Sequence, residues 1–429
     1  MADNFANRTV LSGLAPSTSG SNILATAEVG EPSQSGIINS EWWSWTAPNS
    51  GTFTIHTKNS NFDTFLSVFT GSAVNNLTWK GSNDDGGGNQ TSLLSLNVTA
   101  GTPYQIAVDG FGNSTGSIQL NIVPVVINGT PDQDTLTGTA YPETINGLED
   151  SDTLFGGAGN DTLNGGDNGD YLDGGPGADQ LTGGSSNDVG NDVYVVDNVG
   201  DVVTELGNMN LPGNQHDGVL SSITYTLPAG IEHLNLTGSA AINGTGNNFY
   251  NELKGNSNNN TLNGLAGNDN LNGEEGSDTL NGGLGQDFLR GGTGTNTFVF
   301  LFGESLVSAT DNITDFEIGS SKIDLLTDGG AQMSAPTSFS RAANSAVTTL
   351  SDVVAQVFID ANGGLAGSQA LGTNSAALIV ATNASIAGNY LVINDVTAGF
   401  QASKDLVIKL TTIGTFPPVG AIPVTNFFV

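Results

Sequence analysis

The 429-residue chain is long enough for two to four domains, each able to bury its own hydrophobic core. Its 42 acidic and 9 basic residues give a net charge of −33, which excludes nucleic acid and an anionic membrane surface as main partners because nothing neutralises phosphates. The chain has no cysteine, which excludes disulfides, thiolate catalysis and cysteine-type zinc sites.

The first twenty residues carry neither a basic start nor a continuous apolar stretch. They therefore predict no N-terminal secretion signal of the Sec type. No apolar run approaches the ~18 residues that a transmembrane helix needs, so we expect no transmembrane segment. Either the protein stays in the cytosol or it is exported by a route whose signal lies in another part of the chain.

Residues 1–125 alternate apolar and polar side chains in short stretches such as 53–55, 65–69 and 104–108, separated by turn-forming clusters. This spacing predicts an antiparallel β-sandwich. The segment resembles the bacterial pre-peptidase C-terminal domain, which accompanies secreted enzymes and surface proteins. The stretches that carry the resemblance are WWSWTAPNSGTFTIHT (42–57), NFDTFLSVFTG (61–71) and AGTPYQIAVDGFG (100–112).

Two features of this segment leave alternatives open. Asp84 and Asp85 could bind calcium, as related domains do, or could form an ordinary acidic turn. The cluster of Trp42, Trp43 and Trp45 could face a ligand, or its members could alternate between core and surface.

From Gly129 onward a nine-residue repeat organises the sequence. Each unit starts with glycine, has a polar residue five places later and an apolar residue two places after that. The acids at the polar position are Asp134, Glu143, Asp152, Asp161, Asp170, Asp179 and Asp188 in a first block (129–188) and Asp269, Asp278 and Asp287 in a second block (255–298). The apolar residues are Leu136, Ile145, Leu154, Leu163, Leu172, Leu181, Leu262, Leu271, Leu280, Leu289 and Phe298.

Each unit is interpreted as a six-residue turn, in which glycines take positive φ, followed by a three-residue strand whose central residue points inward. Two units complete one coil, so acids 18 residues apart lie on the same edge, about 4.8 Å from each other. Two carboxylates at that distance repel by roughly 3 kcal/mol at an effective dielectric near 20. A calcium ion held by carboxylate and carbonyl oxygens removes this repulsion. The spacing therefore predicts several calcium ions between adjacent coils.

The units GGAGNDTLN (156–164) and GGLGQDFLR (282–290) resemble the calcium-binding nonapeptide of repeats-in-toxin (RTX) proteins, in which ions lie between the coils of a parallel β-roll. The resemblance implies that the ten acids named above are calcium ligands. The pairs it favours are Asp134/Asp152, Asp152/Asp170, Asp161/Asp179, Asp170/Asp188 and Asp269/Asp287, with Glu143/Asp161 weaker because of the longer Glu side chain.

Asparagine replaces the acid at Asn251, Asn260 and Asn296, where hydrogen bonds of Asn and Gly could hold the coils without a metal. Charge placement nevertheless favours calcium in the repeat as a whole. Residues 128–298 contain 24 acids against Lys254 and Arg290, a net −22 of the chain's −33.

An insert at roughly 189–243 separates the two blocks but keeps strand-like stretches at 193–196, 219–227 and 231–236. It resembles the longer rungs that interrupt RTX rolls, so we expect the same solenoid to continue with wider coils. In such a strand His233 falls on the face opposite Leu234 and Leu236, which predicts a solvent-side residue rather than a ligand.

After Phe300 the repeat ends. ITDFEIGSSKIDLL (313–326) resembles the segment that caps RTX rolls, and residues 376–413 resemble the "bluetail" domain that follows such repeats in cyanobacterial proteins. Strands are expected at 391–393 and 406–408. The apolar end, 426–429, is similar to the uncleaved signals of type I export, which predicts an extracellular or cell-surface location reached without an N-terminal signal peptide.

These expectations combine into an all-β protein. We predict an N-terminal antiparallel β-sandwich (1–125), a central parallel β-roll (126–300) and a β-rich C-terminal capping and export domain (301–429).

RTX rolls accompany metalloproteases, lipases and epimerases, so catalysis has to be considered. A His-Glu-x-x-His zinc motif is absent, since the three histidines are His56, His216 and His233, and no nucleophile elbow has a helical context. We therefore predict no enzyme activity. Three functions remain in competition: a secreted calcium-dependent structural or surface protein that could polymerise with itself, a module that binds polysaccharide or peptide, and a hydrolase with an unrecognised site.

Overall fold

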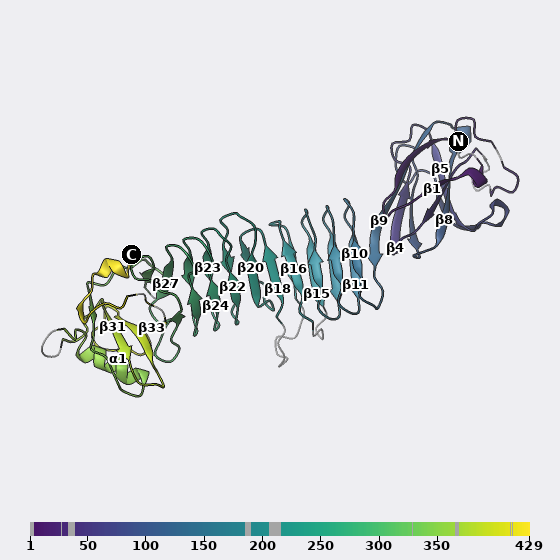
Figure 1. Ribbon diagram of the computed structural model, residues 1–429. Helices are drawn as coiled ribbons and strands as arrows, with labels where there is room; N and C mark the ends of the chain where they lie inside the picture. The colour runs from purple at the N-terminus through teal and green to yellow at the C-terminus, as the bar shows by residue number, and fades with distance from the viewer. Residues whose placement is uncertain are drawn as a thin grey trace. The chain divides into compact units, whose positions relative to one another are not determined.

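The computed structural model describes residues 4–26, 28–32, 39–184, 190–205, 216–327, 329–364, 369–411, 413 and 415–429. The chain forms two compact units, 1–194 with 198–208 and 195–197 with 209–429, and the boundary falls within strand β16 (Val193–Val196). Each unit is built almost wholly of β-strands, which confirms the all-β prediction (Figure 1). The boundaries expected at 125 and 300 stay predictions.

The first unit begins with two sheets packed face to face, which confirms the β-sandwich. One sheet has the order β1-β3-β8-β5-β6, and the other contains β2, β9, β4 and β7. All their pairings are antiparallel except that of β1 with β3. The bounds are β1 Thr9–Leu11, β2 Ser17–Ser21, β3 Glu41–Thr46, β4 Ser50–His56, β5 Thr64–Thr70, β6 Thr78–Asn83, β7 Leu93–Val98, β8 Pro103–Gly110 and β9 Ser117–Asn128, with 3-10 turns at Phe5–Asn7, Val74–Asn76 and Phe111–Asn113.

All three tryptophans of β3 are buried, on both faces of their strand. Trp43 and Trp45 belong to the core between the sheets, where the ring centroid of Trp45 lies 5.0 Å from that of Phe53. Trp42 points to the opposite face, where Phe5 and Phe69 cover it. The alternative in which the cluster faces a ligand is therefore wrong, and so is the expected alternation between core and surface, because the N-terminal turn buries the second face.

Strand β9 joins the sandwich to the repeat region within the first unit. Most of its length pairs antiparallel with β2 and β4, whereas Val126–Asn128 also pair parallel with Thr144–Asn146 of β11. The sandwich sheet therefore continues directly into one sheet of the roll. The first coil therefore pairs with a strand, β9, that is already packed in the sandwich core.

The coils of the first block stack in parallel with an 18-residue register, so Thr135 pairs with Thr153 and Thr144 with Thr162 (Figure 1). The inward series from Leu136 to Leu181 is buried as predicted. Beyond it the step from Gln180 to Val202 lengthens to 22 residues. One face contains β10 (Thr135–Thr137), β12 (Thr153–Phe155) and β14 (Tyr171–Asp173), and the other contains β11 (Thr144–Leu148), β13 (Thr162–Gly166), β15 (Gln180–Gly184) and β17 (Val202–Thr204).

The second unit continues with parallel coils in the same pattern. The step from Gly218 to His233 is 15 residues, the next is 19, and the register returns to 18 from Glu252 onward. One face contains β18 (Gly218–Ser221), β20 (His233–Leu236), β22 (Glu252–Lys254), β24 (Asn270–Asn272), β26 (Phe288–Arg290) and β28 (Asn312–Ile313). The other contains β19 (Tyr225–Thr226), β21 (Gly244–Thr245), β23 (Thr261–Asn263), β25 (Thr279–Asn281), β27 (Thr297–Leu301) and β29 (Lys322–Leu326).

The C-terminal part closes this unit by adding strands to the end of the roll. Strand β33 (Leu406–Leu410) pairs with β28 and continues the sheet through β32 (Gly388–Asn394), β31 (Ser375–Ala381), β30 (Ser338–Arg341) and β34 (Gly420–Ala421). Helix α1 (Leu350–Ile359) packs Val353, Val354 and Val357 against this sheet. A 3-10 turn at Val424–Asn426 then places Phe427 and Phe428 in the core.

Candidate metal centre

The acids of the repeat form hydrogen-bonded ladders along the turns. From coil to coil the backbone N–H at the polar position donates to the side-chain Oδ1 of the residue one coil further on, which is a carboxylate oxygen except at Asn296. The N···O distances are 2.7 Å from Asp134 to Asp152, 2.8 Å from Glu143 to Asp161 and 2.7 Å from Asp269 to Asp287. The 18-residue spacing thus stacks the carboxylates as the sequence predicted.

The second oxygen of these carboxylates is buried without a hydrogen-bond donor. This is true of Oδ2 of Asp152, Asp161, Asp269, Asp278, Asp287 and Asp311. The ion pairs of the described residues, such as His233–Glu252 and Lys254–Glu274, do not involve these six acids, so no basic side chain there compensates them. A buried carboxylate without a partner costs several kcal/mol, so a cation with oxygen ligands fits this position.

Glycine at the first position of each unit leaves space beside the buried Oδ2 atom of the acid. A methyl group at Gly147 would overlap both Oδ2 of Asp152 and the carbonyl oxygen of Gly165, one coil on. A methyl group at Gly264 would meet Asp269 and Gly282 in the same way. A carboxylate oxygen and a carbonyl oxygen from adjacent coils therefore converge where only glycine leaves room, and both are ligands that calcium prefers.

Burial raises the pKa of the ladder acids. The pKa rises to about 7 for Asp269, to about 6 for Asp278 and Asp287, and to about 8 for Asp311. Desolvation is the main cause in each, and the hydrogen bond from the preceding coil opposes it. The same cause raises the pKa of Asp152, Asp161 and Glu143 in the first block.

These shifts predict opposite pH dependences with and without calcium. Because the folded pKa values exceed the unfolded value of about 4, protonation favours the folded state, and this contribution is lost as the pH rises through about 6 to 8. Calcium binds the deprotonated acids, so its affinity increases over the same range. In excess chelator we expect the melting temperature to fall from pH 5 to pH 8, and in excess calcium we expect this fall to disappear. A melting temperature that rises with pH in chelator would contradict the assignment.

The predicted acids that the structure describes lie either inside a block or in the first coil of the roll. Asp152, Asp161, Asp170 and Asp179 lie inside the first block, and Asp269, Asp278 and Asp287 lie inside the second. Asp134 and Glu143 lie in the first coil, where Thr130 donates to Oδ2 of Asp134 and Thr139 donates to both carboxylate oxygens of Glu143. Asp188 lies outside the described residues.

Three further acids occupy ladder positions that the nine-residue count missed. The backbone N–H of Asp170 donates to Asp192, that of Asp179 to Asp201, and that of Asp287 to Asp311. The steps are 22, 22 and 24 residues. The signal that could have found all three is an acid two places before a buried apolar residue, here Tyr194, Val203 and Ile313.

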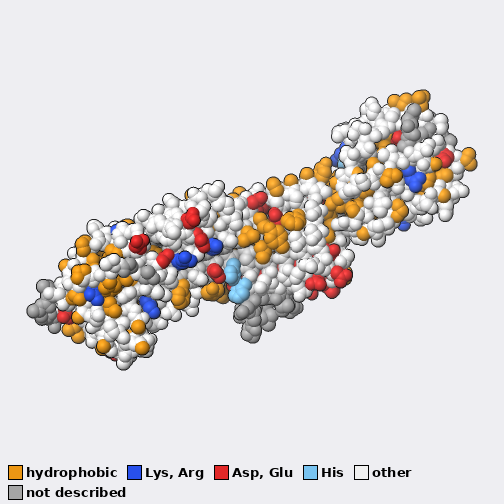
Figure 2. All heavy atoms as spheres, in the orientation of Figure 1, with side chains coloured by type: hydrophobic (Ala, Val, Ile, Leu, Met, Phe, Trp, Pro, Cys, Tyr) orange, Lys and Arg blue, Asp and Glu red, His pale blue; other side chains and the backbone are white. Residues whose placement is uncertain are grey.

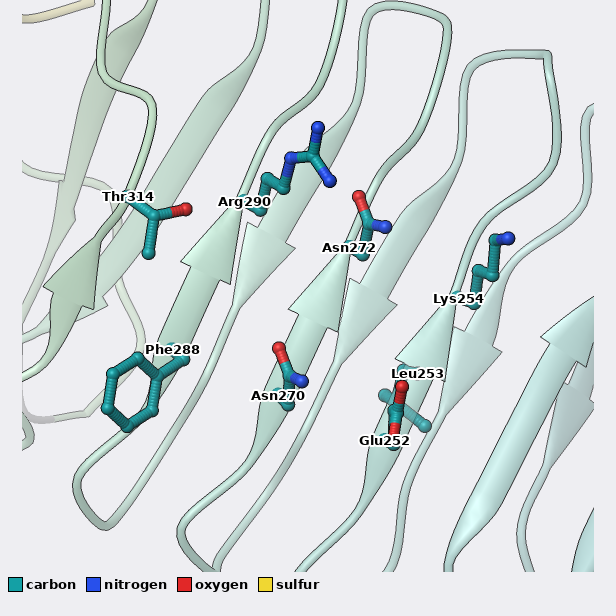
Figure 3. A pocket seen from close by; sticks show the side chains of 8 residues that line it. All are labelled: Glu252, Leu253, Lys254, Asn270, Asn272, Phe288, Arg290 and Thr314. Atoms are coloured by element: carbon teal, nitrogen blue, oxygen red, sulfur yellow. The ribbon is translucent and has the colours of Figure 1, made fainter. Parts of the chain in front are cut away.

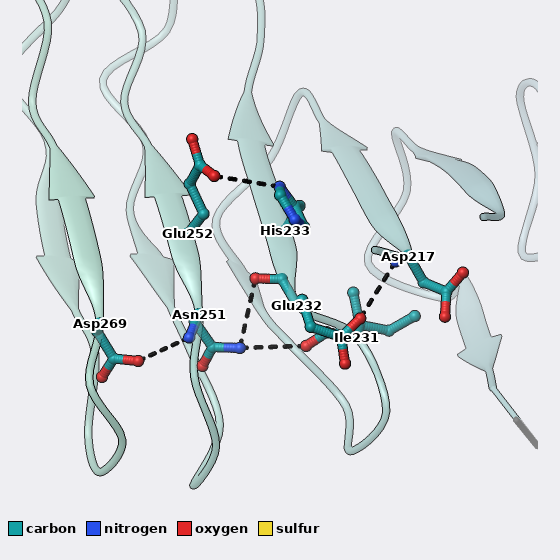
Figure 4. A network of polar contacts seen from close by, with 7 residues as sticks. All are labelled: Asp217, Ile231, Glu232, His233, Asn251, Glu252 and Asp269. Atoms are coloured by element: carbon teal, nitrogen blue, oxygen red, sulfur yellow. Dashed lines mark hydrogen bonds and ion pairs between the residues drawn. The ribbon is translucent and has the colours of Figure 1, made fainter. Parts of the chain in front are cut away.

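Asparagine at the polar position closes its coil without an ion. In Figure 4 the side-chain amide of Asn251 donates to the carbonyl of Ile231 at 3.1 Å, and its backbone N–H donates to Asp269. Asn260 likewise donates to the carbonyl of Ile242 at 2.5 Å. The amide nitrogen replaces a cation, which supports the alternative of hydrogen-bonded coils at these two positions. His233 lies on the outer face, half-buried, 3.6 Å from Glu252 (Figure 4).

A second acidic cluster lies in the sandwich. Oxygens of Asp63, Asp84 and Asp85 come within 4.8 Å of one another, and one buried oxygen each of Asp63 and Asp84 lacks a hydrogen bond. Burial and the neighbouring carboxylates raise the pKa of Asp63 and Asp84. Asp63 was missed because it lies about twenty residues from the acidic turn, in the loop before β5.

Comparison with protein families matches the repeat region. The model of the RTX calcium-binding nonapeptide repeat (4 copies) matches residues 128–163, 137–172, 161–191, 254–289 and 264–298. A search of curated proteins finds no match to the chain. The matched segments are those in which the buried carboxylate ladders lie. Residues 128–191 and 254–298 are therefore RTX calcium-binding repeats, and the chain binds calcium ions at several sites.

Proposed function

We propose that this protein is a secreted, calcium-dependent structural protein of the cell surface, a component of a matrix, sheath, surface layer or adhesive structure, without enzyme activity. The observation that carries the proposal is the buried Oδ2 atoms of Asp152 and Asp161 in the first block and of Asp269, Asp278 and Asp287 in the second, which have no hydrogen-bond donor among the described residues. Such a region is costly to fold without calcium and is joined coil to coil when calcium is bound.

Calcium concentration differs across a cell envelope, so folding that requires calcium should occur on one side of it. Where calcium is scarce, the acid ladders repel and the roll stays expanded, which suits passage through an export channel. Outside, abundant calcium favours the folded coils. Among the described residues no helix is long and apolar enough to cross a membrane. We propose type I export with a C-terminal signal, followed by folding at the cell surface.

Secretion should depend on the C-terminal part. Deletion of residues 380–429 removes β32, β33 and the apolar end, so we expect the truncated protein to accumulate inside the cell. Leu391→Asp, which disrupts the buried β32 and leaves the end of the chain in place, is the control for loss of folding. Normal secretion of the truncated protein, or equal retention of both variants, would contradict a C-terminal export signal.

Self-assembly is the second expectation from this proposal. The sandwich sheet ends on β6, an edge strand with Trp79 53% exposed, and exposed edges can pair with other chains. The net charge of −33 keeps copies apart, so assembly should require calcium to screen or bridge them. Electron microscopy of the purified protein at millimolar calcium should show ordered polymers that dissolve in chelator. Monomers at every calcium concentration, together with hydrolytic activity, would overturn the proposal.

A role in binding polysaccharide or peptide is the second candidate function. Its original support, an exposed Trp cluster in the sandwich, is lost because Trp42, Trp43 and Trp45 are buried. A groove on the roll of the second unit, lined by Lys254, Phe288 and Arg290 among others, supports such a role.

A further inference from the structure

The outer face of the roll in the second unit carries two parallel rows of side chains. The 18-residue register aligns Glu252 with Asn270 and Phe288 in one row. It aligns Lys254 with Asn272 and Arg290 in the other (Figure 3). The leucines between the rows, Leu253, Leu271 and Leu289, point inward and are buried. The rows therefore stand on a rigid sheet whose core fixes their spacing.

A groove follows these rows across the sheet. Its first part, about 320 Å³, is lined by both rows together with Thr314. A second cavity of about 250 Å³ shares Phe288 and continues over Asn312, Lys409 and Tyr390. The pairing of Phe288 with Asn312, and of Asn312 with Lys409, shows that the same row extends from β26 to β33. An extended ligand could thus contact several consecutive strands.

Two basic side chains, Lys254 and Arg290, line this groove beside one acid, Glu252. Lys254 and Arg290 are the two basic residues among the 24 acids of residues 128–298, and they lie in the same row. In Figure 2 a small group of basic side chains lies beside the histidines of this unit, among acidic neighbours. Lys254 pairs with Glu274 at 3.2 Å, whereas Arg290 is exposed and has no acidic partner among the described residues. The groove therefore offers a guanidinium group to a ligand anion.

The other side chains of the groove suit a sugar ring. Phe288 is 50% exposed and presents an apolar ring surface, and Asn270 and Asn272 can donate to and accept from hydroxyl groups. Arg290 can bind a carboxylate in a two-pronged hydrogen bond. Adjacent strands lie about 4.8 Å apart, so an extended sugar chain that crosses them would meet Asn272 and then Arg290. We propose that this groove binds an acidic polysaccharide, with Phe288 stacking on a sugar ring and Arg290 binding a uronate carboxylate.

This site is separate from the calcium ladders. Lys254, Phe288 and Arg290 lie within strands β22 and β26, whereas the ladder acids lie at the turns, so the two can be tested independently. The roll must be folded to form the groove, and binding is therefore measured at one saturating calcium concentration. If the wild-type protein responds to calcium but binds no glycan, the groove proposal alone is overturned. If the roll folds without calcium, only the proposed calcium-dependent function is overturned.

The test is calorimetric titration of the full-length protein with a hexamer of galacturonate, which is too short to gel with calcium. We expect binding that weakens with added salt, and about a tenfold loss of affinity in Arg290→Gln, since the lost hydrogen bond is charge-assisted. Phe288→Ala should also lose affinity. Lys80→Gln, which removes an exposed charge in the sandwich, is the matched control and should bind as the wild type does.

Three outcomes would overturn the proposal. The first is no measurable binding of the hexamer at saturating calcium. The second is equal affinity for a neutral cellohexaose, which would remove the role of Arg290. The third is wild-type affinity in Arg290→Gln, which would place the anion on the bound calcium instead. An unchanged calcium midpoint in the circular dichroism of each variant shows that the roll remains folded.

Discussion

Replacing Asp152 and Asp161 together by Asn should raise the calcium concentration needed to fold the roll by about tenfold or more. Each replacement removes a charge-assisted interaction worth roughly 1.5–3 kcal/mol from a different ladder. Asn keeps the Oδ1 acceptor for the backbone N–H of the preceding coil. It also supplies the amide donor that closes the coils at Asn251 and Asn260. The double variant should therefore be more stable than the wild type in chelator and less responsive to calcium.

The control changes the same net charge away from the ladders. Asp132→Asn with Asp167→Asn removes two exposed carboxylates from the same block. Circular dichroism during a calcium titration should give a wild-type midpoint for this control and a shifted midpoint for the ladder variant. Equal midpoints for both double variants would show that Asp152 and Asp161 are not ligands.

Phe427→Ala should destabilise the C-terminal part of the second unit by about 3–5 kcal/mol, the usual cost of truncating a buried Phe. The Phe427 ring is fully buried, stacks on Phe316 at 5.2 Å between centroids and meets Phe339 edge-on at 4.7 Å. Its carbonyl also accepts the backbone N–H of Ile323 in β29 at 2.7 Å. The apolar end of the chain thus belongs to the core that covers the last coil.

The matched control is Val429→Ala, because Val429 is 58% exposed and has little packing to lose. Urea unfolding in saturating calcium should show the large loss for Phe427→Ala and a change within about 0.5 kcal/mol for Val429→Ala. Equal stabilities of Phe427→Ala and the wild type would mean that the end of the chain does not cap the roll.

The repeat region was the most predictable part of the fold. A strict nine-residue period determines both the inward residue, as at Leu163, and the stacked acid, as at Asp161. The same local rule places each glycine where a side chain would overlap the next coil, as at Gly147. Each of these features depends on neighbours at a fixed sequence distance, which a count along the chain can find.

The features that escaped prediction depend on contacts without a fixed spacing. Asp192 and Asp311 continue the ladders only because their coils lengthen to 22 and 24 residues. Asp63 joins Asp84 and Asp85 through sheet pairing in the sandwich. Trp42 is buried because a turn near the N-terminus folds back over it. Periodicity carries no information about such contacts.

Helix α1 is a different kind of omission, since its sequence does carry a local signal. Thr349 caps the helix by accepting the backbone N–H of Asp352 at 3.2 Å, and Val353, Val354 and Val357 form one apolar face. The cap and the i, i+3, i+4 spacing are recognisable in the sequence.

Near pH 8, where most ladder acids are ionised, the roll should fold only when calcium occupies the ladders. Hydrogen exchange of the native protein, followed at the backbone amides of residues 153–155, 162–166 and 270–272 in excess chelator and then in millimolar calcium, tests it most directly. We expect rapid exchange at these amides in chelator and strong protection in calcium, while the amides of the sandwich strand β8 stay protected in both. Strong protection of the roll amides in chelator would contradict calcium-dependent folding of the roll.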